Sequence, residues 1–249
     1  MPRTHASLPR LFVPHALDGD EGIELGKEQS LYLAAVLRKG VGDEVVLFNG
    51  RDGAWLARID SAAKKAVYLE LEEQIEPQPR RGDLWYGFAP LKAARLDYVV
   101  QKATEMGAAT IQPVITRYTQ VSRIQLDRMR ANAVEAAEQC EVLNVPEVVP
   151  EIQLDRLLAE WTQIHGDRLL VVADEAAPSA SPIGPLAGLA GRSIGLLIGP
   201  EGGFAEEERM KLLAQPFVVP ISLGPRILRA DTAAVAALAV IQSIIGDWR

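Results

Sequence analysis

Two loops near the carboxyl end of the chain decide the fold. Residues 193–204 read SIGLLIGPEGGF, and residues 217–229 read FVVPISLGPRILR. Each begins with a short apolar run typical of a buried strand, which ends before a Gly-Pro step. Runs of this kind belong to parallel sheets, in which ligands bind beyond the carboxyl ends of the strands. We expect the two loops to lie on neighbouring strands of one sheet.

The sequence on either side of these loops alternates between strand and helix patterns. Strands are expected at residues 84–88, 111–115, 168–173, 193–198 and 217–221, and helices at 95–106, 126–140, 206–213 and 232–245. This alternation predicts an α/β domain whose mainly parallel sheet is covered on both faces. Residues 178–191, rich in Pro, Gly, Ala and Ser, are expected to form a loop.

The first part of the chain has a different pattern. Short strands are expected at residues 10–13, 44–49, 54–59 and 67–71, with one amphipathic helix at 27–38. The strands on either side of Gly50–Gly53 predict a hairpin, and the whole reads as a small, mainly β module. Residues 73–83, EQIEPQPRRGD, combine prolines, a glycine and dense charge. We therefore divide the chain into domains at 1–75 and 76–249.

Composition narrows the class of protein. The chain is 48% hydrophobic and 24% charged, so its 249 residues can form a core without disulfides or metals. The single Cys140 fits a reducing compartment, and no signal peptide pattern opens the chain. The apolar run at 233–245 is too short to span a bilayer, and the three histidines lack metal spacing. We predict a soluble, cytoplasmic protein that associates with no membrane and binds no metal.

Charge is distributed unevenly along the chain. The formal net charge is −7, which argues against a protein coated with basic residues. Between Arg80 and Arg130, however, nine Lys and Arg residues stand against four Asp and Glu residues. Such a local excess suits a surface that contacts phosphates, and it suits a solvated helix face equally well.

The final helix, at residues 232–245, has no clearly polar face. A helix that is apolar all round is buried on all sides. Either a partner subunit covers part of it, or it is an ordinary core helix.

The two Gly-Pro loops are poor phosphate sites. The first lacks the GxGxxG spacing and the lysine of GxxxxGK[ST], and Glu201 would repel a phosphate. A ligand with positive charge suits it better, and S-adenosylmethionine, with its sulfonium beside the reactive methyl group, is such a ligand. The alternative, a pair of tight turns without a ligand, stays open on this pattern alone.

Several motifs give the chain a family resemblance. They are LKAARLD at 91–97, VQKATEMG at 100–107, GPEGGF at 199–204, LGPRILRADTA at 223–233 and VLRKGVGDEVVLFNG at 36–50. Together they resemble the ribosomal RNA small subunit methyltransferase E family over the whole chain. The resemblance implies a SPOUT-type α/β domain with a trefoil knot, and a small N-terminal PUA-like β-barrel that binds RNA. It implies a homodimer that uses S-adenosylmethionine to methylate N3 of uridine 1498 of 16S rRNA in the assembled 30S subunit.

The resemblance also implies site residues. Arg229 is the candidate for stabilising the uracil anion or fixing a nearby phosphate. Glu201 is the candidate for accepting the uracil proton or orienting the ribose or the methionine amine. Lys102 has a second interpretation, a salt bridge on its own helix. The cofactor residues implied are Leu197, Ile198, Gly199, Pro200, Glu201, Gly202, Ile221, Leu223, Gly224, Ile227 and Leu228. The substrate residues implied are Arg10, Arg38, Lys92, Arg95 and Lys102.

The chain departs from the family pattern at three places. Tyr32 stands where the family often has a histidine, residues 141–143 where it often has Gly-Arg, and Asp231 where it usually has Glu. The change at 141–143 removes an arginine that could contact RNA. Two other functions remain open: a SPOUT methyltransferase acting on tRNA or another rRNA site, and a ribosome-assembly factor that binds RNA without catalysis.

Overall fold

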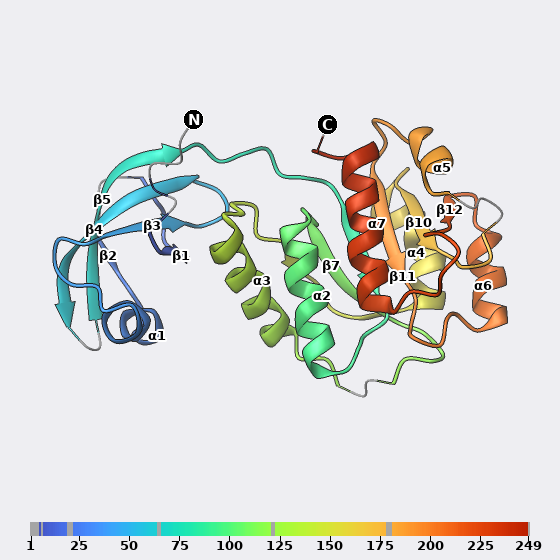
Figure 1. Cartoon of the computed structure of the whole chain (residues 1–249), viewed down its shortest axis with the longest axis horizontal. Helices are drawn as coiled ribbons and strands as arrows, with labels where there is room; N and C mark the ends of the chain where they lie inside the picture. Colours follow the sequence, from blue (N-terminus) through green and yellow to red (C-terminus); the bar gives the residue numbers. More distant parts are fainter. Residues whose placement is uncertain are drawn as a thin grey trace. The chain divides into compact units, whose positions relative to one another are not determined.

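The fold is built on two separate sheets, one in each of two units (Figure 1). A computed structural model describes residues 5, 7–18, 22–63, 66–120, 123–177 and 181–248. The first unit comprises Met1–Arg81 and Ala137–Val145, and the second comprises Gly82–Ala136 and Pro146–Arg249. The chain thus leaves the first unit, returns to it for one short segment, and leaves it again.

The sheet of the first unit has five strands in the order β1-β3-β4-β5-β2. Strand β1 is parallel to β3, whereas β3–β4, β4–β5 and β2–β5 are antiparallel. This agrees with the expected hairpin and the mainly β module. The elements are β1 Arg10–Phe12, β2 Ile23–Glu24, α1 Lys27–Leu31, a π-helical turn η1 Tyr32–Val36, β3 Glu44–Phe48, β4 Ala54–Ala63 and β5 Ala66–Glu76.

Strand β3 explains why the first unit needs the returning segment. Val45 and Leu47 belong to a core cluster that also holds Leu33. Val46 and Phe48 point the other way, as alternate residues of a strand do, and pack with Ala137 and Leu143. Both faces of β3 are therefore covered, so its sequence, EVVLF, does not alternate between apolar and polar residues.

Two elements of the first unit differ from the expected ones. The predicted helix at 27–38 is an α-helix only to Leu31 and continues as a π-helical turn, which carries the buried Leu33. Strand β5 runs to Glu76 because β4 pairs with it along nearly its whole length. The charged segment expected to be a linker therefore begins as a strand.

The sheet of the second unit is parallel throughout. Its strands are ordered β12-β10-β11-β6-β7-β8, and β9 pairs with β7. This confirms the α/β domain with a mainly parallel sheet. The strands are β6 Trp85–Phe88, β7 Thr110–Ile115, β8 Glu147–Val148, β9 Ile152–Gln153, β10 Leu169–Ala173, β11 Ile194–Ile198 and β12 Val218–Ile221.

Helices cover both faces of this sheet. Helices α2 and α7 contact each other on one face, and α4 and α6 contact each other on the opposite one (Figure 1). The second face is filled by apolar side chains around Trp85 and Trp161, whose rings meet edge to face at 5.2 Å. The helices are α2 Ala93–Glu105, α3 Leu126–Cys140, α4 Leu154–His165, α5 Ile183–Ala187, α6 Glu206–Leu213 and α7 Ala230–Ile244.

Two helices were not expected from the sequence. Helix α4 buries Leu154, Leu157, Leu158 and Trp161, whose spacing places them on one face. The apolar spacing of these four residues is the sequence pattern that indicates this helix. Helix α5 lies within the segment expected to be a loop, and its Leu186 is fully buried. Within the described residues, no helix is long and apolar enough to cross a membrane.

Helix α7 is buried on one side only. Ala234, Ala237, Leu238 and Ile241 face the core, whereas apolar residues on its other side are half-buried. Gln242 is also buried, and its side-chain amide donates a hydrogen bond of 2.6 Å to the carbonyl of Met106, just beyond the end of α2. The predicted burial on all sides is therefore incomplete in the single chain.

Candidate functional site

The two Gly-Pro loops lie at the carboxyl ends of parallel strands, but the strands are not neighbours. The first loop, residues 199–204, follows β11, and the second, residues 222–229, follows β12. Strand β10 lies between β11 and β12 and hydrogen-bonds to both. The expectation of neighbouring strands is therefore wrong. Both loops border the same region because the end of β10 fills the gap between them.

A cavity of about 460 Å³, which we call the loop cavity, opens between the two loops and the end of β10. It is of the size that small-molecule sites have, roughly 300–1,000 Å³. Of the expected cofactor residues, Ile198, Gly199, Pro200, Glu201, Gly202, Ile227 and Leu228 line it. Leu223 and Gly224 line a smaller adjoining cavity of about 80 Å³. Leu197 and Ile221 are buried strand residues and line neither.

The lining of the loop cavity is predominantly acidic. Its described charged residues are Asp174, Glu175, Glu201, Glu206 and Arg209. Asp174 accepts two-pronged hydrogen bonds from Arg209, from Nε at 3.1 Å and from Nη2 at 2.9 Å. These bonds to Asp174 raise the pKa of Arg209. Since Asp174 and Arg209 neutralise each other, the remaining carboxylates leave the cavity with net negative charge.

Asp174 and Glu175 were missed by the sequence analysis. The signal was available, because they directly follow the apolar strand at 168–173 in the way that the Gly-Pro loops follow theirs. The carboxyl end of any parallel strand is a place to look for ligand contacts.

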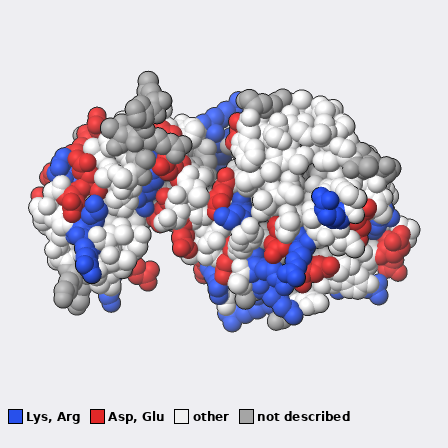
Figure 2. Space-filling model, in the orientation of Figure 1, with Lys and Arg blue, Asp and Glu red and all other residues white. Residues whose placement is uncertain are grey.

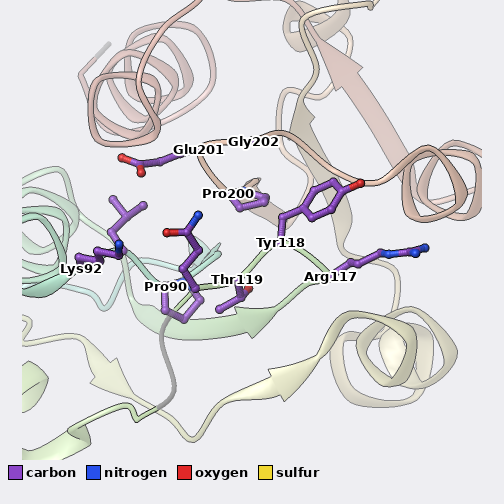
Figure 3. Close-up of a pocket in the computed structure, with 10 residues that line it drawn as sticks. Pro90, Lys92, Arg117, Tyr118, Thr119, Pro200, Glu201 and Gly202 are labelled. Atoms are coloured by element: carbon purple, nitrogen blue, oxygen red, sulfur yellow. The ribbon is translucent and has the colours of Figure 1, made fainter.

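A second cavity, of about 630 Å³, is also lined by residues of the first loop (Figure 3). We call it the turn cavity, after the turn at residues 116–120 that forms one wall. Lys92 and Glu201 lie on one side of it, and Tyr118 on the other. The lining residues are Pro90, Leu91, Lys92, Arg117, Tyr118, Thr119, Gln120, Pro200, Glu201 and Gly202. Pro200, Glu201 and Gly202 line both large cavities, so the two share a wall.

The turn at 116–120 is held in place by hydrogen bonds. Thr119 Oγ1 accepts a bond of 2.9 Å from the amide of Thr116. Glu208 on α6 accepts a bond of 2.8 Å from the amide of Arg117 and one of 3.1 Å from the amide of Ala205. One carboxylate therefore connects the turn to the end of the first loop. This contact cannot be read from the sequence, because Arg117 and Glu208 lie 91 residues apart.

Two expected substrate residues lie beside the first loop. Lys92 is exposed at the edge of the turn cavity, immediately before α2, and has no ion-pair partner among the described residues. Arg95, one turn into α2, forms an ion pair with Glu201. The structure thus brings together a candidate substrate residue and a candidate catalytic residue.

Other expected site residues do not line these cavities. Lys102 pairs with Glu105 at 2.7 Å, which is its alternative interpretation, and lies over the ring of Tyr98 at 5.6 Å. Arg229 is exposed, immediately before α7, and is not among the lining residues of the cavities. Arg10 and Arg38 belong to the first unit.

The two arginines of the first unit differ in exposure. Arg38 is exposed, in the left-handed backbone region with φ 55°. The side chain of Arg10 is only 9% exposed and pairs with Glu141 at 3.5 Å. A direct contact between Arg10 and RNA would require this pair to open.

The basic stretch at 80–130 is partly neutralised by ion pairs. Arg128 pairs with Asp97 at 2.5 Å, and Arg117 with Glu207 at 3.5 Å. Figure 2 shows Lys and Arg side chains over the lower edge of the second unit with acidic side chains among them. Pairing reduces the local positive charge that the sequence suggested. In the part of the chain that the structure describes, no group of three His, Cys, Asp or Glu side chains could hold a metal ion.

Comparison with protein families gives two matches. Residues 77–242 match an RNA methyltransferase domain, and residues 25–72 match an RNA methyltransferase PUA domain. The ribosomal RNA small subunit methyltransferase E of Rickettsia conorii is 32% identical over 235 residues, 94% of each chain. The protein of the same name from Buchnera aphidicola of Acyrthosiphon pisum is 26% identical, over 97% of this chain and 96% of its own.

Comparison with solved structures agrees with these family matches. A Legionella pneumophila protein with its bound cofactor S-adenosylmethionine is 31% identical and has a TM-score of 0.83, covering 95% of this chain and 97% of its own. The ribosomal RNA small subunit methyltransferase E of Neisseria gonorrhoeae, bound to S-adenosylmethionine, is 26% identical and has a TM-score of 0.85. That match covers 97% of this chain and 100% of the other.

Proposed function

Because the chain belongs to the ribosomal RNA small subunit methyltransferase E family, we propose that it methylates N3 of uridine 1498 of 16S rRNA in the assembled 30S subunit. It is a ribosomal RNA methyltransferase that depends on S-adenosylmethionine, with a SPOUT-type α/β domain and an N-terminal PUA-like domain. The observation that carries the proposal is the pair of adjoining cavities, one acidic and formed by both Gly-Pro loops. We place the reaction in the cytoplasm, where ribosomal subunits are found.

The loop cavity fits S-adenosylmethionine in size and charge. Its carboxylates Glu175, Glu201 and Glu206 suit a ligand that carries a sulfonium and an ammonium group. Glycines keep the first loop compact: a Cβ at Gly199 would lie 2.9 Å from the ring of Phe204. Gly224 in the second loop has φ +99°, which other residues rarely adopt. We propose that the expected cofactor residues of both loops hold the ligand here.

The reaction needs the uracil to lose a proton. When bound, S-adenosylmethionine supplies a methyl group on a positively charged sulfur: the N3–carbon bond forms as the sulfur–carbon bond breaks, its electron pair stays on sulfur, and the N3 proton leaves. Glu201 lies in the wall that both cavities share, where its carboxylate can accept that proton. Arg95 now holds this carboxylate. An RNA phosphate that drew Arg95 away would free Glu201 for the reaction.

Arg229 is proposed to stabilise the uracil anion, and Lys92 to contact RNA beside the base. An interaction made only in the transition state is worth roughly 2–4 kcal/mol, by analogy with lost oxyanion donors. We expect Arg229→Ala to lower kcat accordingly and to leave S-adenosylmethionine affinity unchanged. Lys92→Ala should instead weaken RNA binding and its salt dependence. Single-turnover kinetics on 30S particles separate the two; wild-type rates for Arg229→Ala at saturating substrate would remove its catalytic role.

We further propose that residues 1–75 bind RNA and that residues 76–249 carry catalysis.

We also propose that the second unit contains a trefoil knot. Three observations support the knot. The two loops come from strands on either side of β10, α7 follows the edge strand β12, and α7 packs back across the sheet against α2 and β11. Such a knot would be one of the rare exceptions to un-knotted topology.

Methyl transfer to isolated ribosomal subunits tests the function. The full chain is incubated with labelled S-adenosylmethionine and 30S particles from a strain that lacks the modification, with naked 16S rRNA and tRNA as controls. We expect one methyl group per 30S particle, on N3 of the proposed uridine, and little on either control. Label on tRNA or on another base would indicate a different substrate, and no transfer at all would indicate an RNA-binding factor.

A further inference from the structure

We propose that the turn cavity receives the target uracil, rotated out of its stack, and that Tyr118 is the ring on which the base stacks. The proposal rests on the function proposed above. A nitrogen that accepts the methyl group must come close to whatever occupies the loop cavity. Of the described cavities, the turn cavity shares the wall Pro200–Gly202 with the loop cavity, so a base bound there would lie on the other side of Glu201.

Tyr118 has the properties of a stacking platform. The residue is 49% exposed, and its ring contacts no other aromatic ring among the described residues. It lies beside the first loop, because a Cβ at Gly202 would be 3.9 Å from its Cδ2 atom. An exposed aromatic face offers a base replacement for the stacking that it loses on leaving the RNA.

The backbone that carries Tyr118 is held by hydrogen bonds. Glu208 accepts hydrogen bonds from the amides of Arg117 and Ala205, so the residue before Tyr118 is connected to the residue that follows the first loop. The hydrogen bond from the amide of Thr116 to Thr119 closes the turn around Tyr118. A turn that is already ordered loses little conformational freedom when RNA binds.

The remaining lining offers polar groups that suit uracil. Gln120 presents a side-chain amide, whose NH₂ can donate to one of the two carbonyl oxygens that flank N3. Lys92 places a positive charge at the edge of the same cavity, where it can contact an RNA phosphate beside the bound base (Figure 3). The aromatic ring and the amide suit a flat, oxygen-rich base.

Substitution of Tyr118 tests the assignment. Tyr118→Phe keeps the ring, so it should retain the stacking and methylate 30S particles faster than a variant without an aromatic ring. Tyr118→Leu removes the ring and should reduce the second-order rate of transfer roughly ten- to hundredfold, the range expected for one lost base stack. Calorimetric affinity for S-adenosylmethionine should be the same in all variants, which also shows that they are folded. Ile164→Ala, an exposed apolar change on α4 outside the cavities, is the control and should leave the rate unchanged.

A crosslink provides a second measurement that does not depend on a variant. A 30S particle reconstituted with 5-iodouridine at the target position is irradiated with the wild-type protein, and we expect the crosslink on the peptide that carries Tyr118. Wild-type kinetics in Tyr118→Leu, or a crosslink elsewhere in the chain, would overturn the base site while leaving the function intact. If the wild-type protein transfers no methyl group to 30S particles, the function fails and the base site fails with it.

Discussion

Tyr86 is a side chain whose hydroxyl group adds nothing to the fold. It is fully buried in β6 with its ring stacked on Phe88 at 5.4 Å, and burial raises the pKa of its hydroxyl. Among the described residues, that hydroxyl has no hydrogen-bond partner. An unpaired buried polar group costs free energy, and its removal leaves the ring packing intact.

We therefore expect Tyr86→Phe to keep or raise the free energy of unfolding, by about 0–2 kcal/mol. Tyr68→Phe is the matched control, since the Tyr68 hydroxyl donates to Glu24 at 2.5 Å on the surface, and its loss should be mildly destabilising. Urea denaturation of both variants measures the difference. A loss of more than about 1 kcal/mol in Tyr86→Phe would contradict an unpaired hydroxyl.

Glu141 accounts for one of the three departures from the family pattern. It follows the end of α3 with φ 59°, the left-handed region that favours glycine. Glu141→Gly should relieve roughly 1 kcal/mol of backbone strain. It also removes the partner of the buried Arg10, which costs more, so we expect a net loss of about 1–3 kcal/mol.

The double variant Arg10→Met, Glu141→Gly separates the two effects. Removing both charges should recover most of the stability that Glu141→Gly loses, because no unpaired charge stays buried. Thermal unfolding of the four proteins of this cycle gives the coupling between the two side chains. If Glu141→Gly and the double variant were equally stable, the stability of the fold would not depend on the pairing of Arg10 with Glu141.

Helix α4 ends in a histidine that makes the stability of the second unit depend on pH. The ring of His165 lies between Trp161, at 4.2 Å, and Trp85, at 5.5 Å. Burial, followed by the charge of Arg168, lowers the pKa of His165 to about 4. The folded chain therefore keeps this ring neutral at pH values where the unfolded chain protonates it.

The sign of the pH effect follows from this shift. The pKa of His165 in the folded chain lies below its unfolded value of 6.5. Its contribution to the free energy of unfolding is therefore complete above pH 6.5 and is lost as the pH falls from 6.5 to about 4. We expect a loss of about 1–3 kcal/mol across this window, reduced by the partial exposure of the ring. Urea denaturation at pH 7.5 and 5 measures it, and His165→Leu should flatten the dependence. A steep dependence that persists in His165→Leu would assign it to another group.

The sequence predicts where the strands and helices lie along the chain better than it predicts which of them pack against one another. Most strands and helices of the second unit follow the apolar pattern, because burial in a parallel sheet requires it. The pattern does not say which strands pair, and so β10 between the two loops could not be foreseen. The same limit applies to the site: the Gly-Pro loops are visible in the sequence, whereas Tyr118 joins them only through contacts between distant residues such as Arg117 and Glu208.

For the whole molecule, we expect an obligate homodimer. Val235, Val240 and Ile244 on α7 are only half-buried, and Ile227 in the second loop is 93% exposed. Apolar surface of this kind marks an interface. We expect Val240→Glu to give monomers with weakened cofactor binding, and Ile164→Glu on α4 to remain a dimer. Light scattering over a range of concentrations measures both, and a stable, active wild-type monomer would rule the dimer out.

The return of the chain to the first unit has a consequence for anyone who wishes to dissect this protein. Ala137 and Leu143 cover Val46 and Phe48, yet they follow the whole first segment of the second unit, Gly82–Ala136, in the chain. A fragment that stops after β5 therefore leaves a bare apolar patch and invites aggregation. A fusion of the first unit to another enzyme would therefore have to include residues 137–145 as well as the N-terminal strands.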